Sequence, residues 1–157
     1  MKFVCSFCIL FLLGCQQQFT GTHLRFEMIA PQQTELFIVD NDKSIAYGGG
    51  LNAVEGKTTW QGELNLKQKS KYKSILTKTD WLKTPPENDK NVGTGHYNVR
   101  LRDNEFDYKF TLSLTDTKAT KLYKFLQRVS RERLKRHLDA LPRSNVDTII
   151  DRKLKTE

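Results

Sequence analysis

The chain has 157 residues, a formal net charge of +8 at neutral pH and three cysteines, Cys5, Cys8 and Cys15. A length of this order allows one domain that buries a core of its own. Since residues 16–157 contain no cysteine, that part of the chain has no disulfide, no thiolate zinc site and no cysteine nucleophile. The positive charge favours anionic neighbours, which include lipid head groups, acidic polymers, acidic proteins and nucleic acid.

The first element is an uncharged, mostly apolar segment, residues 3–13, which follows the single charge of Lys2. As a helix it would be about 16 Å long, whereas a helix needs about 20 apolar residues to cross a membrane. A segment of this length is typical of the hydrophobic region of a signal peptide. We therefore expect an exported protein, and export argues against nucleic acid as its partner.

The apolar segment runs into Leu12-Leu13-Gly14-Cys15, which resembles the lipobox of bacterial lipoproteins. The resemblance implies that the signal peptide, residues 1–14, is removed and that the Cys15 thiol receives a diacylglycerol. Two or three acyl chains, such as palmitate, hold a protein firmly at a membrane, where one chain is marginal. Gln16 is not the acidic residue linked in that family to inner-membrane retention, which implies an outer-membrane protein facing the periplasm. The alternatives are an ordinary secretory signal and a core strand with a chance cysteine.

The rest of the chain divides into a tether with the lipidated cysteine at residues 15–23, one domain at 24–150 and a polar tail at 151–157. The domain begins with three segments that have strand patterns, and Asp40-Asn41-Asp42 is a turn signal for a hairpin between the second and the third. These segments are residues 24–28, 35–39 and 44–47.

Gly48, Gly49 and Gly50 are the most unusual local feature of the sequence. Three glycines allow positive φ and close backbone approach, so the run is either a loop that binds a ligand or a bulge where a strand changes direction. Trp60 follows on the next predicted strand, residues 58–64, and we name it with the glycines as the candidate ligand loop. If Trp60 points outward beside the glycines, a groove there is the first place to look for a ligand; otherwise it belongs to the core.

The second half of the domain predicts a helix, a hairpin and a second helix. Asn65 is an N-cap for a helix with an apolar stripe at Tyr72, Ile75 and Leu76. Two strands follow, and the length of the second and its pairing across a tight turn predict that it lies near the centre of the sheet. Thr115-Asp116 caps the last helix. The two strands are residues 96–102 and 106–114, and the last helix has its stripe at Leu122, Phe125, Leu126 and Val129.

Together these elements predict an α+β fold in the order β-β-β-β-α-β-β-α. We expect an antiparallel sheet of five or six strands with both helices packed on one face. Over Ile45–Val129, the order of a Gly-Gly loop, strand, helix, hairpin and helix resembles small bacterial proteinase inhibitors of the emfourin type. No inhibitory residue is carried over from that resemblance.

The sequence offers no recognisable catalytic or metal-binding motif. His23, His96 and His137 have no metal-ligand spacing, and His96 with Asp103 is the one pair that a hairpin would bring together. We therefore expect no enzyme activity, no cofactor and no metal. A hydrolase with an unrecognised site is the alternative, favoured if His96 or a pair of carboxylates lies in a deep pocket.

The basic run of the last helix is the candidate contact surface. It consists of Arg128, Arg131, Lys135 and Arg136, with Lys121 and Lys124 one or two turns upstream. It is either a surface attracted to an anionic partner or a solvated helix face lightly paired with Glu132 and Asp139. The leading hypothesis is a lipid-anchored, non-enzymatic domain of the cell envelope that binds a protein or an anionic polymer. A proteinase inhibitor or accessory subunit is the second.

Overall fold

The computed structural model describes residues 21–90 and 92–140, without the side chains of 133, 134 and 136–140. The signal peptide, Cys15, most of the tether and the tail from 151 lie outside the described residues. The elements are β1 (His23–Ala30), β2 (Gln33–Asp40), β3 (Ser44–Gly49), α1 (Leu51–Val54), β4 (Trp60–Glu63), α2 (Leu66–Thr79), β5 (His96–Arg102), β6 (Asp107–Ser113) and α3 (Thr117–Ala140). Among the helices of the described residues, none is long and apolar enough to cross a bilayer.

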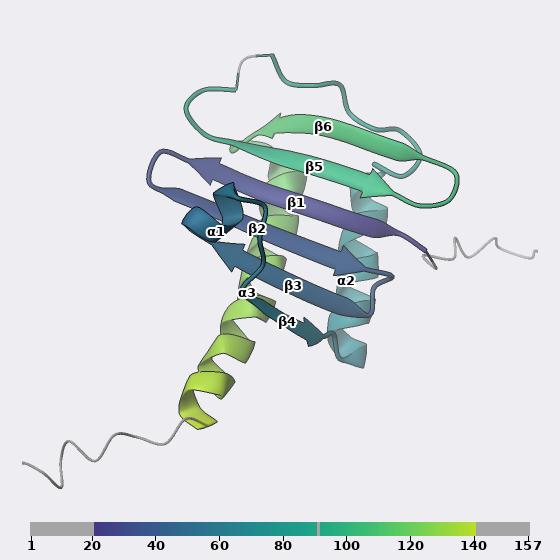
Figure 1. The fold of residues 1–157 in the computed structure, drawn as a ribbon. Helices are drawn as coiled ribbons and strands as arrows, with labels where there is room; N and C mark the ends of the chain where they lie inside the picture. The colour runs from purple at the N-terminus through teal and green to yellow at the C-terminus, as the bar shows by residue number, and fades with distance from the viewer. Residues whose placement is uncertain (1–20, 91, 141–157) are drawn as a thin grey trace, which may run out of the picture.

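The strands form one six-stranded sheet in the order β4-β3-β2-β1-β5-β6, and every neighbouring pair is antiparallel. Helices α2 and α3 both cover the same face of this sheet (Figure 1). The α+β prediction, with its antiparallel sheet of five or six strands and two helices on one face, is therefore confirmed. The short helix α1 was not predicted, and it lies on the opposite, outer face.

The prediction that the strand of residues 106–114 lies near the centre of the sheet is wrong. This strand, β6, is an edge strand, and β2 and β1 are central. On β6 the side chains of Phe110 and Leu112 are buried, whereas Leu114 just beyond it is 36% exposed. Alternation reports only that one face of a strand is covered, which holds at an edge as well as at the centre.

The core lies between the inner face of the sheet and the two long helices. Its largest fully buried side chains include Phe26 of β1, Phe37 of β2 and Tyr72 of α2. Trp81, just after α2, packs edge-on against Phe110 with ring centroids 5.2 Å apart. The buried stripe predicted at Tyr72, Ile75 and Leu76 is confirmed.

Both predicted helix caps are confirmed. Asn65 Oδ1 accepts a hydrogen bond of 2.9 Å from the backbone N–H of Gln68, and the Gln68 side chain accepts one of 2.9 Å from the Asn65 N–H. Asp116 Oδ1 accepts a hydrogen bond of 2.7 Å from the Ala119 N–H. These side chains satisfy N–H groups that the first turn of a helix leaves without partners.

The predicted turn between β2 and β3 is confirmed as well. Asn41 and Asp42 have φ values of 50° and 52°, and asparagine and aspartate are the non-glycine residues that best tolerate this region. At the end of α2, Asp80 also has a positive φ of 63°. The helix therefore ends at Thr79.

Candidate functional site

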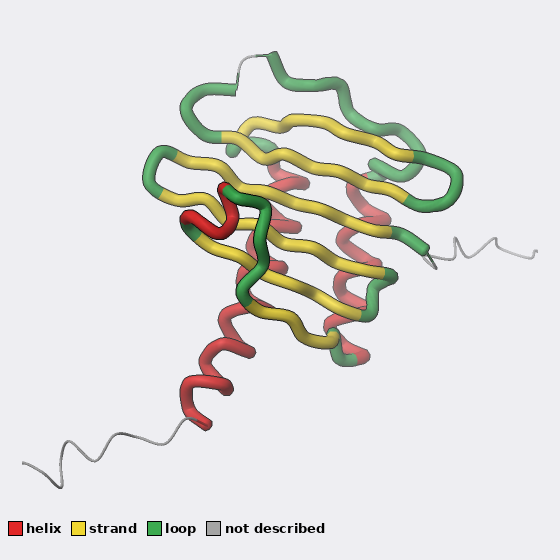
Figure 2. Tube along the Cα trace, in the orientation of Figure 1, coloured by secondary structure: helices red, strands yellow, loops and turns green. Residues whose placement is uncertain are grey.

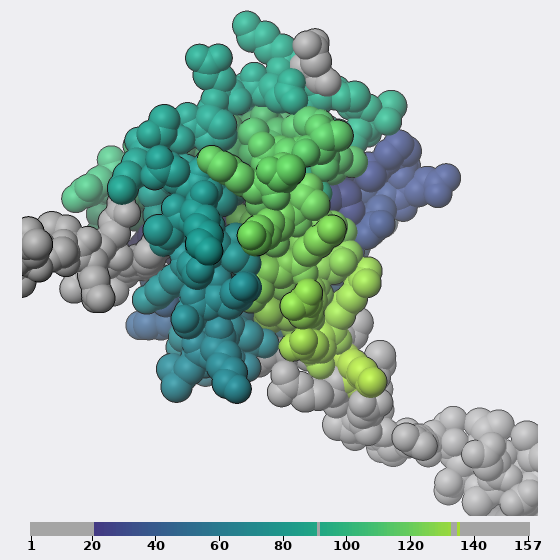
Figure 3. Space-filling model, turned by 180° about the vertical axis from the view of Figure 1, so that it is seen from behind, coloured from purple at the N-terminus to yellow at the C-terminus, as the bar shows by residue number. Residues whose placement is uncertain are grey.

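The helical face of the molecule carries a groove between α2 and α3. These helices lie side by side across this face (Figure 3), and the groove has a volume of about 520 Å³. Ile75, Phe125 and Val129 line its floor, and they are only 4%, 9% and 2% exposed. These three floor side chains therefore leave little of their own surface open to a partner.

A second, smaller hollow of about 210 Å³ continues this groove along the same two helices. Both hollows include Ile75 and Lys121, so they join into one feature. Gln68 lines the groove with Arg128, and Lys78 lines the hollow with Lys118. The two helices therefore run antiparallel, and the feature follows α2 for nearly its whole length, about 20 Å.

We call this feature the cationic seam and define it by its seven basic residues. They are Lys67, Lys71, Lys78, Lys118, Lys121, Lys124 and Arg128.

All seven side chains of the cationic seam are exposed, and none forms an ion pair with another described residue. Glu132 is the one carboxylate that lines the seam. Lys118 Nζ donates a hydrogen bond of 3.0 Å to the Thr79 carbonyl, which ties α3 to the end of α2. The seam is thus a row of cations whose charges are not neutralised within the described fold.

The structure places the residues of the predicted contact surface in different settings. Arg128 lines the cationic seam, as do Lys121 and Lys124 upstream of it. Arg131 is exposed. Its positive charge lowers the pKa values of Tyr47 and Tyr123, but burial and the neighbouring Glu35 raise both values by more. Lys135 is exposed, and the side chain of Arg136 lies outside the described part of the chain. The lysines of α2 that complete the seam were not part of the predicted surface.

The structure explains each of the three glycines by local packing. A Cβ at Gly48 would overlap the backbone carbonyl of Lys57, and a Cβ at Gly49 would lie 2.7 Å from the Tyr47 hydroxyl. Gly50 has a φ of 59° and precedes α1. Gly48 therefore lets the connection from α1 to β4 cross the outer face closely (Figure 2). Trp60 lies opposite Tyr47 in the sheet and packs, partly buried, against the core on the inner face.

A buried polar cluster lies under α3 and was not predicted. Glu35 of β2 is 5% exposed and accepts hydrogen bonds from Tyr123 at 2.8 Å, from Tyr47 at 3.3 Å and from Gln127 at 3.4 Å. Burial raises the pKa of both tyrosines, and the Glu35 charge and its hydrogen bonds raise it further. The alternation of β2 was the one sequence signal for this cluster, because it places Glu35 on the same inner face as Phe37 and Val39. Its partners on α3 follow about 90 residues later, and only the fold brings them to it.

The outer face of the sheet holds a second hollow, which we call the outer-face trough. It has a volume of about 340 Å³ and is open to solvent over β1, β5 and β6. Its polar lining includes Arg25, Glu27, Asn88, Asn98, Arg100 and Lys109.

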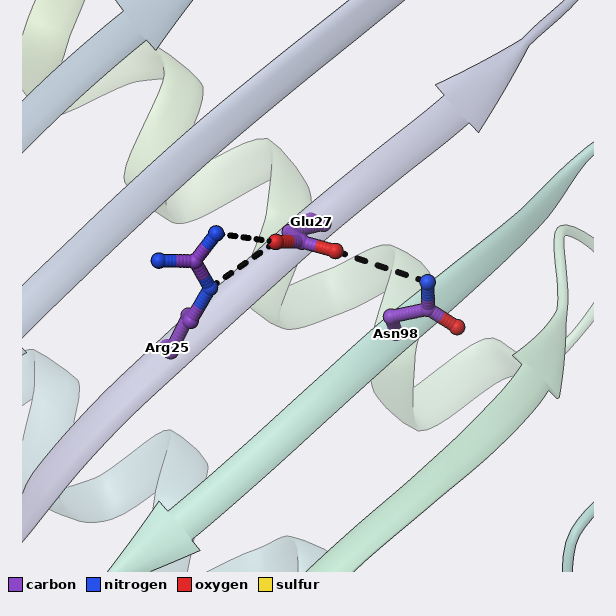
Figure 4. A network of polar contacts seen from close by, with 3 residues as sticks. All are labelled: Arg25, Glu27 and Asn98. Atoms are coloured by element: carbon purple, nitrogen blue, oxygen red, sulfur yellow. Dashed lines mark hydrogen bonds and ion pairs between the residues drawn. The ribbon is translucent and has the colours of Figure 1, made fainter. Parts of the chain in front are cut away.

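Three side chains of the outer-face trough form a polar network (Figure 4). Arg25 donates from Nε to Glu27 Oε1 at 2.8 Å, and Asn98 Nδ2 donates to Glu27 Oε2 at 3.4 Å. Asn98 Oδ1 accepts a hydrogen bond of 3.0 Å from the Thr111 hydroxyl. Glu27 is the one carboxylate among the residues that line the trough, so the trough lacks the paired carboxylates that many hydrolases use.

The histidines of the described residues do not assemble a catalytic site. His96 and Asp103 lie at opposite ends of β5, which separates them by about 23 Å, so the hairpin does not bring this pair together. His23 Nδ1 donates to Asp40 Oδ1 across the β1–β2 pair at the sheet surface. Within residues 21–90 and 92–140, no three metal-ligating side chains gather.

The chain was compared with protein-family models and with curated proteins, and neither comparison gave a match.

Proposed function

We propose that this chain is a bacterial lipoprotein, anchored through acyl chains on Cys15, whose α+β domain binds an anionic polymer of the cell envelope and has no catalytic activity. The cationic seam is the observation that carries the binding proposal. The lipobox resemblance of Leu12-Leu13-Gly14-Cys15 supports the anchor and an exported domain, and Gln16 favours the periplasmic face of the outer membrane in an organism that has one.

The shape and the charge of the seam favour a linear polyanion over a protein partner. Protein interfaces draw most of their affinity from apolar or aromatic anchors buried at their centre, and the floor of the seam is almost completely buried already. A row of exposed cations about 20 Å long instead matches charges repeated along an extended chain. Lysine is suited to this contact because its flexible stem carries a point charge that needs no fixed partner geometry.

The seam is wider than the basic run of α3 considered alone. Lys67 and Lys71 of α2 face Lys124 and Arg128 of α3 across the groove, so cations flank a bound chain on both sides. A solvated helix face with paired charges would instead show its lysines in ion pairs, and the seven cations of the seam form none with other described residues.

The test uses the mature lipidated chain, which begins at Cys15, in a neutral detergent. Linear polyphosphate is the polyanion probe and dextran, a neutral polymer, is the control. We expect the chain to bind polyphosphate with an affinity that falls steeply as salt rises, because binding releases condensed counterions. Binding that is insensitive to salt, or equal binding to dextran, would contradict the proposal. Capture of an acidic envelope protein, with no binding of polyphosphate, would replace the polymer by a protein partner.

No observation favours the alternatives of a proteinase inhibitor or a hydrolase. A proteinase inhibitor of this type would need an exposed glycine loop, whereas Gly48 is buried and Gly49 is half-buried within β3. The hydrolase reading needs His96 or a pair of carboxylates in a deep pocket, and the outer-face trough contains Glu27 as its one carboxylate.

A further inference from the structure

The outer-face trough is independent of the cationic seam, because the sheet lies between the two. Two connections flank it. On one side, the α1–β4 connection passes Arg25, where a side chain added at Gly56 would lie 3.2 Å from Arg25 Nη2. On the other side, Asp89 N–H donates to the Thr111 carbonyl at 2.9 Å, and Asn88 Oδ1 accepts from the Thr111 N–H at 2.8 Å. The trough therefore has a floor of strands and a wall at each side.

Three cations cross the floor of the trough in one row. Arg25 lies opposite Arg100 in the β1–β5 pair, and Arg100 lies opposite Lys109 in the β5–β6 pair. Glu27 pairs with Arg25, and Asp107, which does not line the trough, pairs with Arg100, so Lys109 is the cation of the row that has no ion pair among the described residues. The surplus positive charge at Lys109 favours an anion bound at that end of the row.

The cations of the row keep donors available for a ligand. Arg100 uses Nε and Nη2 for Asp107, which leaves Nη1 of its guanidinium uncommitted among the described contacts. Lys109 is exposed and forms no ion pair with a described residue. It acts on Asp107 only through its charge, which helps Arg100 to lower the pKa of that carboxyl. The row can therefore hold a negative group between Arg100 and Lys109.

The polar network beside the row suits hydroxyl groups. Asn98 is held between Glu27 and Thr111 by hydrogen bonds of 3.4 and 3.0 Å, so its amide is oriented before a ligand arrives. The Glu27 carboxylate and the Thr111 hydroxyl are further acceptors at the same place, and such groups fix the orientation of a hydroxylated ligand.

We propose that the outer-face trough binds a small, hydroxylated organic anion. Its negative group lies between Arg100 and Lys109, and its hydroxyls contact Asn98, Glu27 and Thr111. A volume of about 340 Å³ is at the lower end of the range of small-molecule sites, roughly 300–1,000 Å³. The site thus accepts one sugar-sized molecule, and the negative group is either a carboxylate or a phosphate.

The experiment measures binding to the mature lipidated chain in neutral detergent by isothermal titration calorimetry. The probes are glucose 6-phosphate and glucuronate, with glucose and inorganic phosphate as controls. We expect at least one of the two anionic sugars to bind more tightly than either control, and the stronger of the two identifies the negative group as phosphate or carboxylate. If neither anionic sugar binds better than glucose, the positive row has no role and the proposal fails. If inorganic phosphate binds as well as glucose 6-phosphate, the sugar hydroxyls add no affinity, and the proposed contacts with Asn98, Glu27 and Thr111 are wrong.

The substitution Lys109→Gln locates the binding. Lys109 is exposed, so the variant should fold like the parent, which circular dichroism checks. We expect the affinity for the anionic sugar to fall about tenfold, since a hydrogen bond to a charged group is lost. The matched control is Lys124→Gln in the cationic seam, which should leave sugar binding unchanged. Equal loss in both variants would show that only net charge matters and would overturn the assignment.

Discussion

Tyr123 of α3 donates a hydrogen bond of 2.8 Å to the buried carboxylate of Glu35 on β2, across 88 positions of the chain. This contact ties the last helix to a central strand of the sheet through a polar group that is 5% exposed. A buried carboxylate of this kind is tolerated only when its oxygens are hydrogen-bonded. The pair therefore specifies where α3 docks along the sheet.

Removing the Tyr123 hydroxyl should destabilise the fold. In Tyr123→Phe, Glu35 keeps only the longer contacts with Tyr47 at 3.3 Å and Gln127 at 3.4 Å. We expect the free energy of unfolding to fall by about 2 kcal/mol, because a hydrogen bond to a buried charge is lost. Urea denaturation measures the change. The control is Tyr108→Phe on β6, whose hydroxyl has no hydrogen bond among the described residues, and an equal loss there would contradict the role of Glu35.

Removing the hydroxyl of Tyr72 should stabilise the fold. Its hydroxyl is buried without a hydrogen-bond partner in the described structure, so Tyr72→Phe should raise the free energy of unfolding by about 1 kcal/mol at pH 7. Burial raises the pKa of Tyr72 above its ordinary value of 10.0, and the charges of Asp42 and Asp40 raise it further.

The raised pKa of Tyr72 also sets a pH dependence. Below pH 10 the Tyr72 phenol is neutral in both the folded and the unfolded chain, so its ionisation does not lower the free energy of unfolding there. As pH rises above 10, the unfolded chain loses the proton while the folded chain keeps it, and stability falls. Urea denaturation between pH 9 and 11 should show a shallower fall in Tyr72→Phe than in the parent. If the free energy of unfolding falls equally with pH in the parent and in Tyr72→Phe, the Tyr72 hydroxyl is not buried.

The glycine run should tolerate alanine very unequally. Gly48→Ala places a Cβ on the backbone carbonyl of Lys57, and we expect a loss of about 3 kcal/mol from overpacking. Gly50→Ala, at a φ of 59°, should lose about 1 kcal/mol because an L-residue is strained there. Gly93→Ala is the control, since nothing lies within 4 Å of its added Cβ. Thermal unfolding ranks the three variants, and a loss in Gly93→Ala as large as that in Gly48→Ala would argue against this packing.

Two lysines of the cationic seam should account for part of the salt dependence of polyanion binding. The double change Lys121→Gln and Lys124→Gln removes two cations that line the groove. The slope of log affinity against log salt should become shallower by about 1.4, the value expected for two fewer contacts to a single-stranded polyanion. Titration with linear polyphosphate at several salt concentrations gives the slope, and Lys109→Gln on the outer face is the control. A slope that drops as much in the control would place the contact elsewhere.

Lipidation should depend on one cysteine of the three. Cys15→Ser removes the proposed acylated thiol, so the chain should remain at full length and incorporate no labelled palmitate in a bacterial host. Cys8→Ser changes the preceding apolar segment and should leave both cleavage and labelling intact. Mass spectrometry of the N-terminal peptide reads out both variants. An unmodified peptide that still begins at Met1 in the parent chain would remove the anchor, and with it the assigned compartment.

Local patterns were enough to predict most elements of this fold. Alternation identified the strands, and Asn65 and Asp116 marked the starts of the two long helices, since a cap acts within one turn. The expectation that β6 is central failed because neither the length of a strand nor a tight turn to one neighbour determines whether another strand pairs with its far edge. The glycine run was equally ambiguous, since the carbonyl of Lys57 that explains Gly48 belongs to a connection that returns over the sheet.

The sequence alone determined the fold class, the order of the strands and the two long helices, and the surplus of positive charge, because periodicity, caps and composition act over short stretches of chain. It also supplied the lipobox resemblance, which is a feature of adjacent residues. The tertiary structure alone decided that Lys67 and Lys124 flank one groove, that Arg25, Arg100 and Lys109 form one row, and that Glu35 meets Tyr123. These pairings join positions far apart in the chain, and only the register of the sheet and the docking of its helices bring them together.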